Sequence, residues 1–240
     1  MAHDMWIEPG RFDLGAGDST TLTLRIGERF KGDTVPNVPE WYHRFDVSEG
    51  GDTRAVDGAL GDDPAGRLTA RGDGPIMVVY QSRPDFVEMK GAKFNSYLET
   101  EGMTASARAQ GWSGEPEAKV GEFYARCLKL LVNLPSGELD PALTRARCPI
   151  DLMVTRLGEG HSEVLLEFQG QPLADALVVA YRREAPTEEV RVRTDESGVA
   201  ALMLREPGDW LLTAVHITAR VDGRAQWLSH WAAVHLRLLR

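Results

Sequence analysis

The pattern that most constrains the fold lies in the last third of the chain, where short apolar runs alternate with polar residues between closely spaced turns. Side chains of a β-strand point alternately to its two faces, so such runs predict half-buried strands. The expected strands cover residues 152–156, 163–168, 176–182, 189–193, 199–204, 210–217 and 227–238. Turn signals every 8–12 residues between strands of this length predict a β-sandwich.

The first half gives a similar but weaker β signal. Leu22, Leu24 and Ile26 alternate with polar residues, and residues 76–80 form an apolar run. Residues 92–101 are the exception, because their apolar residues recur at helical spacing and Gly102 stands where a C-capping glycine is expected. The Gly-rich segment 103–121 predicts an exposed excursion, and residues 120–132 fit either a strand or a helix.

The composition permits a buried core, since 42% of the 240 residues are hydrophobic and 26% are charged. A Pro-rich stretch at 135–141 predicts a linker. We therefore expect an all-β protein of two β-sandwich (Ig/transthyretin-like) domains, residues 1–140 and 148–240, with one short helix near 92–102.

The net charge, the cysteines and the first residues limit where the protein can be located and which partners it can have. The formal net charge of -9 argues against nucleic acid and anionic membranes as partners, and we expect no membrane span, because no apolar run approaches about 20 residues. Cys127 and Cys148 form either one disulfide in an oxidising compartment or two buried thiols. The start Met1-Ala2-His3-Asp4 fits a cytoplasmic protein, or an exported chain cut at a signal-peptidase site and given an added Met1.

Motifs for common enzyme chemistry are missing from the sequence. There is no Gly-x-Ser-x-Gly elbow, P-loop or His-Glu-x-x-His, and the acidic residues are too scattered to single out a catalytic pair. We therefore expect no catalytic residues and a protein that is not an enzyme.

Several segments resemble known families. The turns around residues 170–178, 193–200 and 207–212 resemble the transthyretin-like or carboxypeptidase-regulatory β-sandwich, which is a scaffold with many uses. A second set of segments comprises residues 2–9, 27–33, 80–84, 94–102, 123–126, 214–216 and 227–232. Together these segments, in order over nearly the whole chain, resemble the DUF4198 family. Members of that family are exported bacterial proteins, some of them periplasmic components associated with nickel or cobalt uptake.

The resemblance implies a periplasmic or secreted protein whose signal peptide ends next to His3, with a membrane metal permease as its partner. It also implies a transition-metal ion, nickel, cobalt or copper, as the ligand. The sequence departs from the family pattern at His230, where the family has Tyr.

Histidines are the candidate metal ligands, because imidazole suits nickel, copper, cobalt and zinc. His3, with Asp4 beside it, can chelate through the chain terminus, either as the third residue after Met1 or as the first residue of a copper histidine brace. His216 lies opposite His230 if the hairpin turn centres on Gly223, whereas a two-residue turn places Ser229 there. The alternative for each is a histidine that is satisfied by a hydrogen bond or simply exposed.

The other histidines and the tryptophans have less specific interpretations. His43 and His161 lie in polar surroundings, and His235 falls on the face opposite His230, so all three are expected to be exposed. Trp210, Trp227 and Trp231 are expected to pack in the core. Three functions remain open: a metal-binding transport accessory, a non-catalytic interaction module and a copper redox protein.

Overall fold

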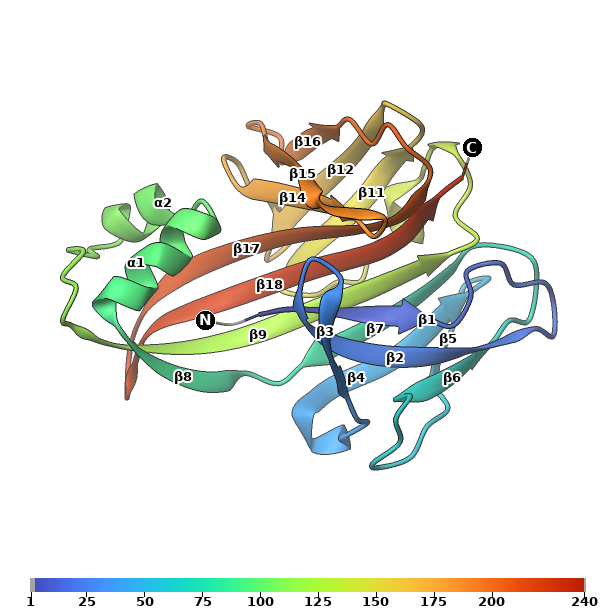
Figure 1. Ribbon diagram of the computed structural model, residues 1–240, viewed down its shortest axis with the longest axis horizontal. Coiled ribbons are helices and arrows are strands. Elements are labelled where there is room, and N and C mark those ends of the chain that lie inside the picture. Colours follow the sequence, from blue (N-terminus) through green and yellow to red (C-terminus); the bar gives the residue numbers. More distant parts are fainter. Residues whose placement is uncertain (1–2, 240) are drawn as a thin grey trace.

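The computed structural model describes residues 3–239, without the side chains of residues 221 and 222. Over that range the strands form sheets of nine, five and four strands (Figure 1). The predicted all-β class is confirmed.

The nine-stranded sheet lies at the centre of the molecule. Its order is β15 (Ala185–Arg193), β14 (Leu177–Arg182), β17 (Gly208–Asp222), β18 (Ala225–Leu238), β9 (Lys119–Val132), β7 (Ile76–Ser82), β4 (Tyr42–Glu49) and β5 (Asp52–Ala55). β8 (Asp85–Lys90) pairs with the other end of β9. β18 and β9 run parallel, from Trp227 opposite Glu122 to Leu236 opposite Leu131. The long hairpin of β17 and β18 therefore joins the two halves of the chain.

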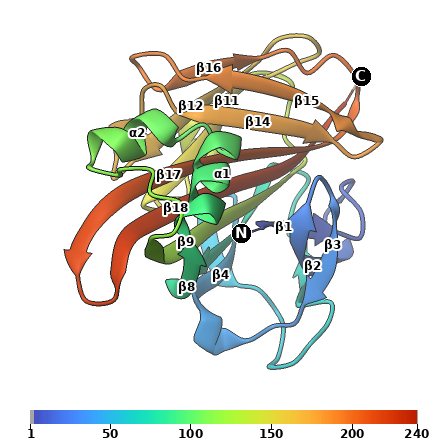
Figure 2. The same ribbon diagram turned by 60° about the vertical axis from the view of Figure 1, so that its left-hand side comes forward.

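The smaller sheets cover opposite faces of this sheet (Figure 2). One comprises β1 (Asp4–Pro9), β2 (Ser19–Glu28), β3 (Lys31–Val35) and β6 (Gly66–Thr69). The other comprises β10 (Gly137–Glu138), β11 (Ile150–Leu157), β12 (Ser162–Phe168), β13 (Gln171–Pro172) and β16 (Val199–Leu202). Each encloses its own apolar core against the central sheet.

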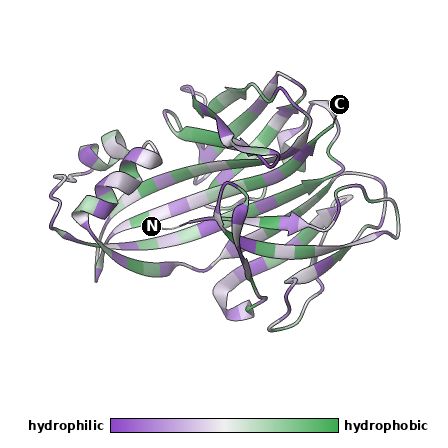
Figure 3. Cartoon of the chain, viewed as in Figure 1, coloured by the Kyte–Doolittle hydropathy of each residue, from purple (hydrophilic) through white to green (hydrophobic). Residues whose placement is uncertain are grey.

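Alternation along the central strands supplies both cores (Figure 3). On β17, Leu212 faces the core under β11 and β12, while Leu211 faces the core under β1 and β2. On β18, Val234 and Ala233 divide in the same way. One continuous sheet thus contains strands from both sides of the predicted domain boundary at residues 140–148. The two-domain assignment stays a prediction.

Helices cover the ends of β17 and β18 that lead into their hairpin turn. The predicted helix is confirmed as α1 (Gly91–Thr100), and Gly102 has a φ of 67°, which suits its expected capping position. Phe94 and Tyr97 of α1 pack against Trp227 and Trp231.

Three further details concern short or ambiguous segments. The segment 103–121 was expected to be an exposed excursion, and it contains α2 (Thr104–Ala109), a second short helix besides the predicted one. Residues 120–132 form a strand, β9. Single 3₁₀ turns occur at Pro39–Trp41 and Pro141–Leu143.

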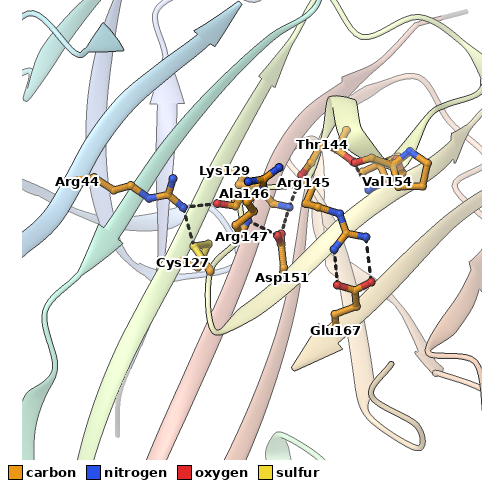
Figure 4. Close-up of polar contacts among 12 residues, drawn as sticks. Arg44, Cys127, Lys129, Thr144, Arg145, Ala146, Arg147, Asp151, Val154 and Glu167 are labelled. Atoms are coloured by element: carbon orange, nitrogen blue, oxygen red, sulfur yellow. Dashed lines mark hydrogen bonds and ion pairs between the residues drawn. A yellow bond between two sulfur atoms is a disulfide. The ribbon is translucent and has the colours of Figure 1, made fainter. Parts of the chain in front are cut away.

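A disulfide and a buried ion pair fasten the connection between the two halves (Figure 4). Cys127 of β9 is bonded to Cys148, which resolves the choice between bridge and free thiols. Lys129 Nζ donates to Asp151 Oδ1 and to the Thr144 carbonyl, both at 2.6 Å, and the Lys129 side chain is 1% exposed. The other Asp151 oxygen accepts from the Arg147 amide at 2.6 Å. These bonds hold the segment that leads into β11 against β9.

Candidate functional site

His216 and His230 lie side by side on the central hairpin. The register places them directly opposite each other on β17 and β18, so the pairing is confirmed. The turn lies between the paired Asp222 and Ala225 and is not centred on Gly223; an irregularity between Ala219 and Asp222 brings the two histidines into register. Both rings pack against Phe168 of β12, at centroid distances of 4.5 Å for His216 and 5.2 Å for His230. The pair therefore lies where the apolar core between the central sheet and β12 ends.

The nitrogens of these imidazoles have no hydrogen-bond partner among the described residues. In the part of the chain that the structure describes, neither ring donates or accepts a hydrogen bond. Burial lowers the pKa of His216, and burial together with the nearby His216 lowers the pKa of His230 to about 4. Both rings are thus neutral at pH 7, the form that offers a lone pair to a metal ion.

His3 and Asp4 lie on the other face of the central sheet. The His3 carbonyl accepts from Arg126 Nη2 at 3.1 Å, and Arg126 points away from the face of β9 that holds Cys127. His3 Nδ1 lies 3.3 Å from Glu28 Oε1. The structure therefore brings His216 and His230 together but places His3 and Asp4 apart from them. The chelate that requires Met1 and Ala2 lies outside the described residues.

Asp4 belongs to a group of carboxylates that the sequence did not single out. Burial, followed by the negative charge of Glu28, raises the pKa of Asp4 to about 7. Burial and the charge of Asp4 raise the pKa of Glu101, just after α1, to about 8. Glu189 of β15 adds to this field. Asp4 and Glu101 therefore keep their protons to a higher pH than ordinary carboxyl groups.

No sequence signal reveals this carboxylate group. Its members come from β1, the end of β2, the end of α1 and β15, and only tertiary packing brings them together. The sequence spacing of Asp4, Glu28, Glu101 and Glu189 follows no motif.

The remaining histidines and tryptophans divide between confirmed and wrong predictions. His43 and His161 are exposed, and Trp210, Trp227 and Trp231 are buried, as expected. His235 was expected to be exposed but is 0% exposed, because its face of β18 is covered by β1. Its Nδ1 lies 2.8 Å from the Ile7 carbonyl oxygen.

Among residues 3–239, no group of three or more His, Cys, Asp or Glu side chains is placed to hold a metal ion. The helices within that range are too short or too polar to cross a membrane.

The fold defines a β-sandwich protein in which His216 and His230 face each other on the central hairpin. A family model described as a domain of unknown function, DUF4198, matches residues 1–218, and the chain belongs to this family. No curated protein matches the sequence.

Proposed function

We propose that this protein is a non-enzymatic, extracytoplasmic accessory of a transport system that carries nickel or cobalt as cargo on His216 and His230. The observation that supports the proposal best is the pair of directly opposed, neutral imidazoles whose nitrogens have no hydrogen-bond partner among the described residues. None of these nitrogens is among the buried side-chain atoms without a partner in the described residues, so the unpaired imidazoles are open to an ion from solvent.

Two imidazoles suit a carrier better than a storage site. Closed structural sites use four protein ligands, whereas a two-ligand site leaves positions for water or for groups of the donor and acceptor proteins. Such a site releases its ion readily, as delivery to a membrane permease requires.

The Cys127–Cys148 disulfide supports an extracytoplasmic location, because disulfides persist in oxidising compartments and are rare in the cytoplasm. The acidic net charge of -9 is compatible with a cationic cargo.

A second candidate is a non-catalytic interaction module. The observation that favours it is the separation of His3 and Asp4 from His216 by the central sheet, which removes two of the four expected ligands from a common site. The same separation argues against a copper redox protein with a histidine brace, because such a brace needs a second histidine beside His3.

Calorimetric titration of the full chain with Ni(II), Co(II), Cu(II) and Zn(II) tests the proposal. We expect one ion per chain, with weaker binding by His216→Ala and by His230→Ala. The exposed His43→Ala and His161→Ala are the matched controls and should bind like the unchanged protein. Binding that survives both site variants, or no binding at all, would leave the interaction module as the better account.

A further inference from the structure

A hollow lies on the face of the central sheet opposite the histidine pair. It has a volume of about 470 Å³ and opens between the first residues of β1, the Trp41 turn, the end of β7 and β9. Small-molecule sites commonly have such a volume, with apolar and aromatic walls and a few polar groups.

Arg126 forms the polar part of this hollow. Its side chain comes from β9 and the residue is only 8% exposed. Nη2 donates to the His3 carbonyl at 3.1 Å, and the guanidinium lies 4.7 Å from the centroid of the Tyr124 ring. Its Nε is buried and has no hydrogen-bond partner among the described residues, so the terminal nitrogens are the part of the guanidinium that a ligand can reach. A largely buried guanidinium favours an anionic partner.

Tyr80 adds a second unused donor. It lines the same hollow, is 3% exposed, and its hydroxyl makes no hydrogen bond to any residue that the structure describes. Burial raises the pKa of Tyr80 to about 12, so the hydroxyl keeps its proton at neutral pH. The Ser82 hydroxyl, which accepts from the Arg126 amide at 2.8 Å, completes the polar floor.

The walls are apolar. Met5, Ile26 and Val35 line the inner side, and Trp41 stands at the mouth with 54% of its surface exposed. An exposed indole beside a hollow offers a flat surface for an apolar or aromatic group.

We infer that this hollow binds a small organic carboxylate with an apolar or aromatic body, its carboxylate on Arg126 and Tyr80 and its body against Trp41. Guanidinium groups recognise carboxylates through charge-assisted hydrogen bonds, and a phenol hydroxyl adds a third donor. Two acids, Glu40 and Asp85, and the basic Arg83 also line the hollow, and Asp85 already accepts from the Tyr124 hydroxyl at 2.7 Å. Neither the histidine pair nor a metal ion takes part in this site.

The experiment is a titration of the full-length protein with phenylacetate, indole-3-acetate and hexanoate, followed by calorimetry and by tryptophan fluorescence. Phenylacetamide, which keeps the shape of phenylacetate without its charge, is the matched ligand control. We expect at least one carboxylate to bind, and the amide to bind at least about tenfold more weakly, because it loses a charge-assisted hydrogen bond.

Variants locate the binding. Arg126→Gln should weaken the best carboxylate at least about tenfold, and Tyr80→Phe and Trp41→Ala should each weaken it about threefold or more. His216→Ala should leave it unchanged, which separates this site from the metal site. If Arg126→Gln fails to fold, Tyr80→Phe and the surface change Trp41→Ala decide the question. The inference is overturned if none of the three carboxylates binds, or if binding is equal in Tyr80→Phe, Trp41→Ala and the unchanged protein.

Discussion

Removal of one member of the Lys129–Asp151 pair should destabilise the protein strongly. In Asp151→Ala the Lys129 ammonium, 1% exposed, keeps only the Thr144 carbonyl as a partner, and the Arg147 amide loses its acceptor. An uncompensated buried charge costs about 3–5 kcal/mol, and the lost backbone partner adds about 1 kcal/mol. We therefore expect a loss of about 4–6 kcal/mol in the free energy of unfolding.

The double variant Lys129→Met with Asp151→Leu distinguishes this reasoning from a simple packing effect. It removes both charges and keeps similar volumes, so we expect a loss of no more than about 2 kcal/mol, less than for either single change. Urea unfolding followed by tryptophan fluorescence measures these differences. The exposed pair Lys90–Glu117, with side chains 73% and 74% exposed, is the control, and Lys90→Met should change stability by less than about 0.5 kcal/mol. Additive losses, with the double variant as unstable as the sum of the singles, would refute the argument.

Three further predictions concern the disulfide, the carboxylate group and α1. Cys148→Ala opens a link between residues 21 positions apart and should cost about 3 kcal/mol, measured by urea unfolding beside the unchanged protein with and without reductant. Folding raises the pKa of Glu101 to about 8, so the folded state holds more protons and stability falls as pH rises from about 4.5 to about 8. Glu101→Gln should flatten that fall in thermal unfolding between pH 5 and 8, and an identical profile in Glu101→Gln and in the control Glu99→Gln would count against it. Phe94 is 0% exposed, so Phe94→Ala should lower the free energy of unfolding by about 3–5 kcal/mol. The amide hydrogens of α1 should then exchange faster, and unchanged exchange would mean that other contacts hold α1.

The sequence predicted the strands of the second half well, because turns and alternation are local signals. The helix near Phe94 was also predictable, since its apolar spacing and Gly102 are both local. α2 was missed because Thr104–Ala109 is short and has little apolar periodicity.

Long-range packing set the limit of prediction. The face of His235 was predicted correctly, but its burial was not, because alternation gives the face and not what covers it. The pairing of His216 with His230 depended on a register shift between Ala219 and Asp222, which the turn residues alone do not predict. The separation of His3 from them depended on which face β1 covers. The same limit hid the carboxylate group around Asp4.

X-ray absorption at the metal edge of the nickel-loaded protein tests the central claim most directly, because it counts the imidazoles bound to the ion. Burial lowers the pKa of His216 and, with the nearby His216, lowers that of His230 to about 4, which favours the neutral rings that a metal ion binds at pH 7. The account predicts two imidazoles per nickel in the unchanged protein and one in His216→Ala or His230→Ala. A spectrum without imidazole, or one that both variants leave unchanged, would contradict it.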